Sequence, residues 1–266
     1  MKSIRSAFVA LGLLLAMTSC GDYNQVLKST DNEFKLNKAI DYYNAKKYNQ
    51  AFALLDELLT TYRGTSKAQD VYLYYCKTVY AQRDYILAQY HYKQFSKTFP
   101  RHPEANEAAY MSAYCMYLDA PSSSLDPAPI YKAMDELQLF INTHAQHPRV
   151  SEANDWMDEL RNRLETKSFE IAKQYNRTQR YAAAVVAFSN TLAEFPDAPY
   201  REEALYLKAV SAFRLAENSI DDKKPLRMKE ARTACREAVS LFPEGRFAKE
   251  LQRVQIKIDA YLQKNS

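Results

Sequence analysis

The side chains that could perform chemistry in this sequence are few and poorly grouped. His144 and His147 are three residues apart in "NTHAQHP", whereas His91 and His102 stand alone. A metal site needs three or four converging ligands, and no segment combines two histidines with the glutamate of a zinc protease helix. The pair precedes Pro148 at a predicted helix end, where imidazole groups can meet free carbonyls. We therefore expect the pair to cap a helix and expect no metal.

Other routes to catalysis lack a motif as well. The chain contains only four glycines, too few for a loop that cradles phosphate, and it contains no nucleophile elbow. A helical cell-wall enzyme would need one deeply held acid, which cannot be identified among the 32 aspartates and glutamates. We predict no catalytic residues and no enzyme activity, with a cell-wall enzyme as the less favoured alternative.

Cys20 is the residue with the clearest chemical context, at the end of "FVALGLLLAMTSC". Two cations, Lys2 and Arg5, precede an apolar run that is too short to span a membrane but typical of a secretory signal. The residues "MTSC" resemble the bacterial lipobox, in which a peptidase cuts before a cysteine that has received a diacylglycerol. This predicts a lipoprotein signal peptide at 1–19 and a covalent lipid on Cys20. The alternative is a plain cleavage site in which Cys20 is only a small residue.

Composition limits the possible partners and folds of the mature chain. Removal of residues 1–19 lowers the formal charge from +4 to +2, so nucleic acid is not an expected partner. Cys76, Cys115 and Cys235 each lie in a helical apolar pattern, and their odd number argues against a disulfide framework. We expect them to be small buried hydrophobes. Few glycines and abundant Ala, Leu, Glu, Lys and Gln predict an all-α fold.

Five segments repeat one pattern, an alanine followed at +4 by a large apolar or aromatic residue and often by an aromatic and proline at +11 and +12. The segments are "AFALLDELLTTY" from Ala51, "AQYHYKQFSKTFP" from Ala88, "AMDELQLFINTH" from Ala133, "AVVAFSNTLAEFP" from Ala184 and "ARTACREAVSLFP" from Ala231. Such spacing places the residues on one stripe of a helix. Another amphipathic segment precedes each one, so the predicted unit is a pair of antiparallel helices.

The helix pairs resemble the tetratricopeptide repeat. Its characteristic small, aromatic and proline positions are occupied in the fourth unit by Ala172, Tyr175, Ala184, Phe188 and Pro196, and in the second by Ala88, Tyr92, Phe95 and Pro100. The resemblance implies a superhelical array of about five pairs. We expect an acylated flexible tail at 20–31, an N-terminal half at 32–150 and a C-terminal half at 151–266. A long helix from about Ser151 to Tyr175 would join the halves, and the proline-rich segment from Asp119 to Pro129 would interrupt the third pair.

Tyrosine is unusually frequent, with 21 in the chain. Tyr48, Tyr75 and Tyr92 fall on packing positions. In tetratricopeptide arrays the first helix of each pair lines a concave groove, and the resemblance assigns groove positions suited to an extended peptide or strand. The polar and aromatic residues at these peptide- or partner-binding positions are Tyr43, Lys77, Tyr80, Tyr110, Tyr114 and Tyr117. The alternative is that neighbouring helices cover these rings.

The lipobox, the short tail "GDYNQVLKS" and the tetratricopeptide-like pairs together resemble the BamD family of lipoproteins, part of the outer-membrane β-barrel assembly machinery. The segments "FPRHPEANEAAYMSAY" and "FPDAPYREEALYLKAVSAF" are typical of it. The resemblance implies a periplasm-facing scaffold tethered to the outer membrane, with no cofactor beyond its lipid. Its C-terminal half would hold the periplasmic domains of the barrel-forming insertase, and its N-terminal groove would receive unfolded outer-membrane protein precursors. A tetratricopeptide lipoprotein adaptor for cell-wall synthesis, gliding or secretion is the main alternative.

Overall fold

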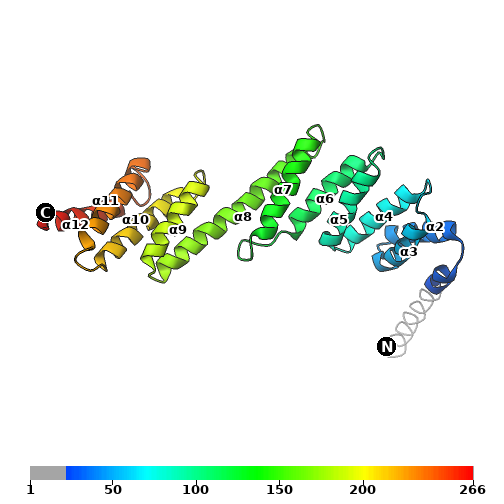
Figure 1. The fold of residues 1–266 in the computed structure, drawn as a ribbon, viewed down its shortest axis with the longest axis horizontal. Coiled ribbons are helices and arrows are strands. Elements are labelled where there is room, and N and C mark those ends of the chain that lie inside the picture. The colour runs from blue at the N-terminus through cyan, green and yellow to red at the C-terminus, as the bar shows by residue number, and fades with distance from the viewer. Residues whose placement is uncertain (1–21, 266) are drawn as a thin grey trace, which may run out of the picture. The chain divides into compact units, whose positions relative to one another are not determined.

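The computed structural model describes residues 22–265, and all the regular elements in this range are helices. The all-α prediction is confirmed, and successive helices run as antiparallel pairs (Figure 1). The predicted signal peptide at 1–19 and Cys20 lie outside the described residues. Two compact units divide the chain. The first contains the described residues up to 120 together with 128–157, and the second contains 121–127 and the chain from 158 onward.

The first unit consists of three helix pairs and the beginning of a fourth. Its helices are α2 (Asn32–Asn44), α3 (Tyr48–Thr61), α4 (Ala68–Ala81), α5 (Tyr85–Thr98), α6 (Ala105–Asp119), α7 (Ala128–Thr143) and the first turns of α8 (Val150–Arg177). Each helix from α2 to α6 packs against the helix that follows it. The repeat alanines Ala51, Ala88 and Ala133 are fully buried at these contacts, so the small residue brings neighbouring helices close together as the repeat predicts.

The second unit continues the pattern with the rest of α8. Its further helices are α9 (Tyr181–Glu194), α10 (Arg201–Glu217), α11 (Lys224–Leu241) and α12 (Ala248–Lys264). Helix α10 packs against α9 and α11, and α12 packs against α11 and α10. Ala184, Phe188 and Ala231 are fully buried. Helix α12 follows the fifth pair and covers its end with an apolar face of Ala248, Leu251 and Ile258.

The proline-rich segment between α6 and α7 is held in place within the second unit. Lys167 Nζ donates hydrogen bonds to the carbonyls of Leu125 at 2.7 Å and Ser123 at 3.4 Å. Arg163 also donates to the Pro121 carbonyl at 3.3 Å. Helix α6 ends at Asp119, so the predicted interruption is present. The segment is stabilised by cations of α8 that satisfy its backbone oxygens.

The turns inside the helix pairs use left-handed residues other than glycine. Lys46, Arg83 and Gln179 have φ values of 58°, 64° and 59°. Each lies two residues before the tyrosine that begins the second helix of its pair, at Tyr48, Tyr85 or Tyr181. At this repeated position, where glycine would fit best, the chain therefore uses Lys, Arg or Gln in the left-handed conformation.

The tail after Cys20 differs from the expected flexible segment. Residues 22–28 are helical, and Val26 is only 3% exposed in the core that contains Leu36. Tyr23 packs edge-on against Tyr42 with ring centroids 5.6 Å apart. A helix of only seven residues is too short to be stable alone. The apolar spacing of Tyr23, Val26 and Leu27 stabilises this one through tertiary packing, which the sequence pattern did not reveal.

The three cysteines behave as the sequence predicts. Cys76, Cys115 and Cys235 are free and buried. Burial raises the pKa of the Cys115 thiol to about 12 and that of Cys235 to about 11. These thiols are therefore protonated and unreactive at neutral pH.

Candidate functional site: an aromatic surface on the first unit

The predicted groove residues of the third pair form a row of parallel rings. Tyr110, Tyr114 and Tyr117 follow the four- and three-residue spacing that places side chains on one face of α6. The centroids of Tyr110 and Tyr114 are 6.0 Å apart with planes at 17°. Those of Tyr114 and Tyr117 are also 6.0 Å apart, with planes at 16°. Helix α6 alone therefore fixes the orientation of three rings.

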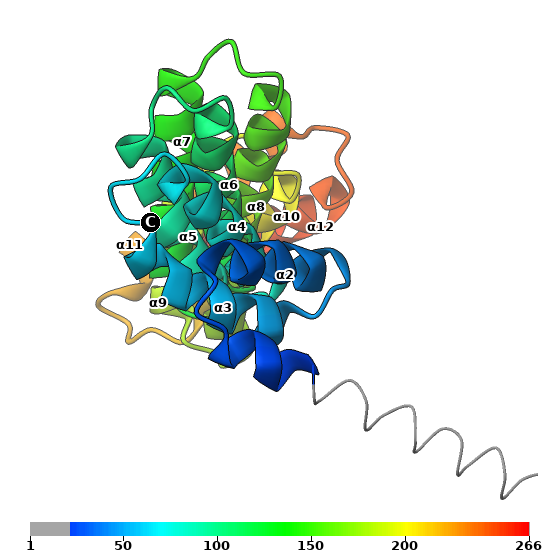
Figure 2. The same cartoon turned by 90° about the vertical axis from the view of Figure 1, so that its right-hand side faces the viewer.

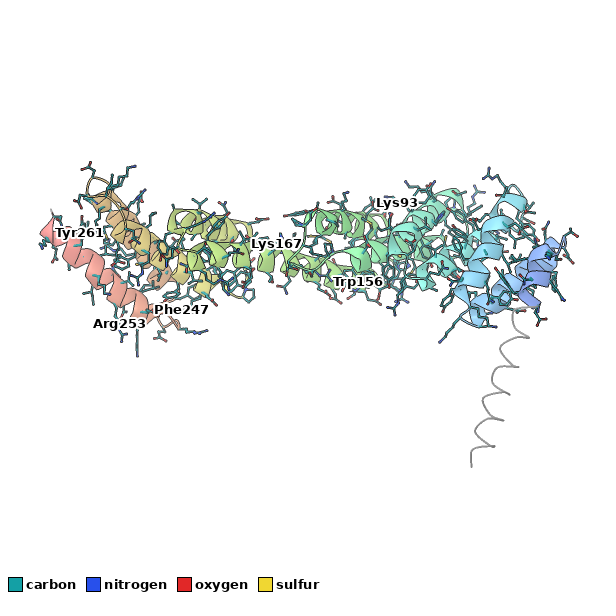
Figure 3. All side chains as sticks on the ribbon, turned by 90° about the horizontal axis from the view of Figure 1, so that it is seen from below. Lys93, Trp156, Lys167, Phe247, Arg253 and Tyr261 are labelled. Atoms are coloured by element: carbon teal, nitrogen blue, oxygen red, sulfur yellow. The ribbon has the colours of Figure 1, made fainter. Side chains whose placement is uncertain are left out.

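Trp156, in the first turns of α8, stacks on this row. Its ring centroid lies 4.3 Å from that of Tyr114 and 5.2 Å from that of Tyr117, with interplanar angles of 21° and 14°. Figure 3 labels Trp156 among the side chains of the first unit. The rings of Tyr114, Tyr117 and Trp156 are half-buried, so each has an accessible edge or face. We call Tyr80, Tyr110, Tyr114, Tyr117 and Trp156 the aromatic cluster.

Tyr110 is the buried member of the aromatic cluster, with only 4% of the residue exposed. Its hydroxyl donates a hydrogen bond to Glu152 Oε2 at 2.9 Å. The Arg149 guanidinium lies 5.0 Å from the ring centroid, and the His147 ring stacks at 5.9 Å. Burial, followed by the hydrogen bond to Glu152, raises the pKa of the Tyr110 hydroxyl. Among the predicted contact residues, Tyr110 is therefore the one that its neighbours cover.

Tyr80 is the member of the aromatic cluster that lies on α4. Its ring lies 6.4 Å from that of Tyr114 and 5.9 Å from that of Tyr85. Burial, with a smaller contribution from Tyr114, raises the pKa of the Tyr80 hydroxyl. The hydroxyls of Tyr80 and Tyr110 therefore remain neutral hydrogen-bonding groups at physiological pH.

The other predicted contact residues form a second group. The Tyr43 ring packs against Tyr74 at 5.7 Å and Tyr48 at 5.8 Å. Lys77 Nζ lies 3.2 Å from Glu104 Oε1 and 5.9 Å from the Tyr74 ring. The charge of Lys77 is thus balanced within the unit, and Tyr43 and Lys77 are joined through Tyr74. The structure places the six predicted residues in two aromatic groups rather than in one continuous row.

Sequence reasoning missed Trp156 because the residue precedes the fourth repeat. The repeat positions of that pair include Ala172 and Tyr175, whereas α8 begins at Val150 and is 28 residues long. Its extra N-terminal turns bring Trp156 against α6. The available signal was that Trp156 is the single tryptophan of the chain, located on the exceptionally long helix.

The histidines have different contacts from those expected. Thr143 Oγ1 lies 2.8 Å from His144 Nδ1. His147 Nδ1 accepts a hydrogen bond from the Arg149 amide at 3.3 Å, and its Nε2 lies 3.6 Å from a carboxylate oxygen of Glu107. The imidazoles thus meet a hydroxyl, an amide and a carboxylate, so the predicted capping of free carbonyls is wrong. Together they fix the turn that leads into α8.

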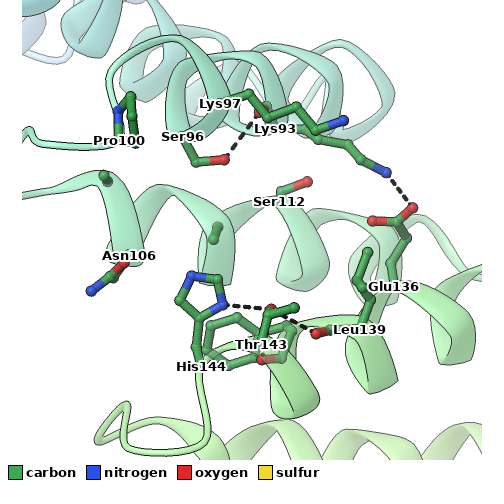
Figure 4. A pocket seen from close by; sticks show the side chains of 13 residues that line it. Lys93, Ser96, Lys97, Pro100, Asn106, Ser112, Glu136, Leu139, Thr143 and His144 are labelled. Carbon is green, nitrogen blue, oxygen red and sulfur yellow. Dashed lines mark hydrogen bonds and ion pairs between the residues drawn. The ribbon is translucent and has the colours of Figure 1, made fainter.

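A pocket of about 310 Å³ lies among α5, α6 and α7 (Figure 4). Phe140 and Leu139 contribute apolar surface, and Lys93 Nζ pairs with Glu136 Oε1 at 2.5 Å on one side. Thr143 donates to the Leu139 carbonyl at 2.7 Å. The ion pair satisfies two of the charged side chains, and Lys97 lines the pocket as well.

Residues 22–265 contain no candidate metal site and no candidate membrane-spanning helix. Within this range no cluster of three or more His, Cys, Asp or Glu side chains is arranged to hold a metal ion. None of the helices described there is both long and apolar enough to cross a bilayer.

Comparison with known families identifies the relationship. The YfiO family, described as outer membrane lipoprotein, matches residues 30–207, which is more than half of the chain. The chain belongs to this family. The match covers the residues of the aromatic cluster, and it supports the BamD-type relationship predicted from the sequence.

The comparisons with curated proteins and with solved structures do not identify a family. No curated protein matches the chain. Among solved structures, the chain is similar to the crystal structure of the P58(IPK) TPR domain, with 16% sequence identity and a TM-score of 0.40. That comparison covers 91% of this chain, which spans 62% of the length of the other.

Proposed function

We propose that this protein is a lipid-anchored scaffold of the outer membrane that faces the periplasm. In this role it binds the barrel-forming insertase and receives unfolded β-barrel precursors before their insertion. The anchor is a covalent lipid on Cys20, and the protein has no cofactor and no catalytic activity. Membership in a family of outer membrane lipoproteins is the observation that carries the proposal.

The aromatic cluster supports the precursor-binding part of the proposal. A transmembrane β-strand alternates apolar and polar residues, and aromatic side chains are concentrated near its ends. Stacked tyrosine and tryptophan rings give such a strand large apolar contacts and hydroxyl groups at a small cost in side-chain entropy. A row of rings also tolerates sequence differences, because every contact is apolar stacking or an edge hydrogen bond. Reversible binding of many precursors requires this tolerance.

The helix pairs of the second unit support the scaffold part of the proposal. Tandem helix pairs form broad surfaces on which folded domains can bind. We assign the second unit to the periplasmic domains of the insertase, and the aromatic cluster of the first unit to precursors. Separate surfaces would allow the insertase and a precursor to bind the same molecule at once.

Trp156 makes the precursor-binding proposal directly testable. Because it is the single tryptophan, its fluorescence reports on the aromatic cluster alone. The mature chain would be titrated with a synthetic peptide that alternates apolar and polar residues and ends in phenylalanine. We expect a saturable change in intensity or emission wavelength, and a much weaker response to a scrambled peptide of the same composition.

A matched pair of variants distinguishes binding at the aromatic cluster from non-specific binding to exposed tyrosines. Tyr114→Ala removes the ring nearest to Trp156, whereas Tyr90→Ala removes a tyrosine of α5 that is 56% exposed. Calorimetry should show weaker binding only for Tyr114→Ala. Equal affinity of both variants, or equal binding of the two peptides to the unaltered protein, would reject the aromatic cluster as the precursor site.

A further inference from the structure

The chain follows a fixed path from its first described residue into the first helix pair. Residues 22–28 form a short helix next to the first helix pair (Figure 2). Val26 is buried, and Tyr23 packs against Tyr42. Asp31 then caps α2, because its Oδ1 accepts the Phe34 amide at 3.0 Å. The described fold therefore begins at Asp22, two positions after the predicted lipid attachment residue.

A groove of about 520 Å³ lies between residues 22–28 and α2. Its apolar surface comes from Val26, Phe34 and Tyr42. Phe34 is 40% exposed, and it lines the groove together with Asp22, the first described residue. Amphipathic aromatic rings such as that of Tyr42 are enriched at the level of lipid headgroups, and exposed Phe34 adds apolar surface to the same groove.

The groove contains equal numbers of positive and negative side chains. Lys38 and Lys47 line it together with Asp22 and Asp41. Lys38 Nζ lies 3.6 Å from Asp41 Oδ2, and Lys47 Nζ lies 5.9 Å from the Tyr42 ring centroid. Both carboxylates are close enough to Tyr42 to add to the burial that raises the pKa of its hydroxyl. A ligand of either single charge would meet repulsion here, whereas a zwitterion would find partners for both of its charges.

We propose that this groove binds the headgroup of phosphatidylethanolamine in the membrane that holds the Cys20 anchor. The two lysines contact the phosphate, and the two aspartates contact the ammonium group. The proposal rests on the acylation of Cys20 proposed above. It places the first helix pair against the bilayer instead of on a flexible tail.

The groove lies close in sequence to the proposed lipid on Cys20, so a weak contact with a headgroup is enough to orient the first helix pair. Only Gly21 separates Cys20 from Asp22, so their Cα atoms can be at most about 7 Å apart. An attached lipid therefore holds the groove among headgroups at a high effective concentration. Each headgroup contact can be weak individually and still fix the orientation of the first helix pair.

The test uses the mature chain coupled at Cys20 to a thiol-reactive diacyl lipid, so that it does not depend on enzymatic acylation. The other three cysteines are buried and will not react under native conditions. Trp156→Phe combined with Phe34→Trp places the single indole at the groove. In phosphatidylethanolamine vesicles with brominated acyl chains, we expect strong quenching of this indole.

Two controls make the result specific. Trp156→Phe with Leu139→Trp places the indole at a half-exposed position on α7 of the same unit, where quenching should be weak. Adding Lys38→Glu and Lys47→Glu to the groove probe should reduce its quenching several-fold. Lys97→Glu with Lys132→Glu, an equal change of charge at exposed lysines, should not. Circular dichroism verifies that all variants remain helical.

Equal quenching at positions 34 and 139, or quenching that survives reversal of the two groove lysines, would overturn the proposal. Equal quenching in phosphatidylglycerol vesicles would replace the zwitterionic headgroup with general phospholipid contact and would also overturn it. The anchor is tested separately by the mass of protein purified from its native membrane. An unmodified Cys20 there would refute the proposed anchor, while the coupled protein still reports on the groove.

Discussion

At the residue scale, Trp156 extends the accessible part of the aromatic cluster by stacking on Tyr114 and Tyr117. Trp156→Ala removes its stacking on Tyr114 and Tyr117, and we expect the strand-like peptide to bind about tenfold more weakly, a loss of roughly 1.4 kcal/mol. Trp156→Phe keeps an aromatic ring and should retain most of the affinity. Calorimetric titration measures both variants, and equal affinities for the two would contradict the role of stacking.

His91 gives the first unit a predictable dependence on pH. Its Nδ1 lies 3.1 Å from the Tyr72 hydroxyl, and its ring lies 4.8 Å from that of Tyr75. Burial lowers the pKa of His91, with Asp56 partly opposing the change. The unfolded chain, with an ordinary histidine pKa of about 6.5, therefore binds this proton more readily than the folded chain.

The His91 contribution to stability is thus complete above about pH 6.5 and is lost as the pH falls toward the lower pKa of the folded state. Urea unfolding of the unaltered protein and of His91→Gln at pH 7.5 and 5.5 measures this difference. The unaltered protein should lose more stability between these values than the variant does. An identical loss in both would show that His91 does not titrate with folding.

At the scale of elements, the turns of the helix pairs store strain that glycine would relieve. Lys46 has φ of 58°, and the Lys47 amide donates to the Tyr42 carbonyl at 2.8 Å in the six-to-one bond of a Schellman motif. The left-handed conformation costs about 1–2 kcal/mol for a residue with a side chain. Glycine avoids this cost but loses roughly 0.5–1 kcal/mol through its greater freedom when unfolded.

We therefore expect Lys46→Gly and Gln179→Gly each to stabilise the protein by about 0.5–1 kcal/mol in thermal or urea unfolding. Lys47→Gly is the matched control, because its φ of −88° is unstrained, and it should destabilise. Stabilisation by the control instead would indicate an effect of charge removal rather than of backbone strain.

Sequence periodicity predicted the elements well where local spacing determines them. The alanine stripes gave the helix pairs, and the absence of internal glycine and proline predicted α8, which spans Val150–Arg177. The docking of residues 22–28 and the position of Trp156 depend on contacts with other helices, so local periodicity could not reveal them. Tyr110 lies on the predicted α6 stripe, but α8 contributes the Glu152 and Trp156 contacts that cover it.

At the scale of the whole molecule, tandem helix pairs should share stability mainly with their neighbours. Phe95 and Phe188 are fully buried on equivalent helices, α5 of the first unit and α9 of the second. Substitution of either by alanine should cost about 3–5 kcal/mol locally. Amide hydrogen exchange should accelerate most in α4–α6 for Phe95→Ala and in α8–α10 for Phe188→Ala. A uniform acceleration along the chain for both variants would show a single cooperative unit instead.

The central claim, an outer-membrane scaffold that joins an insertase to its precursors, is tested most directly by co-purification. The tagged, lipidated protein would be isolated from its native envelope in mild detergent, and its partners identified by mass spectrometry. We predict a large β-barrel protein with periplasmic repeats in stoichiometric amount, together with traces of unfolded barrel proteins that Trp156→Ala reduces. Recovery of cell-wall, gliding or secretion proteins in its place would contradict the claim and identify the chain as an adaptor of another envelope complex.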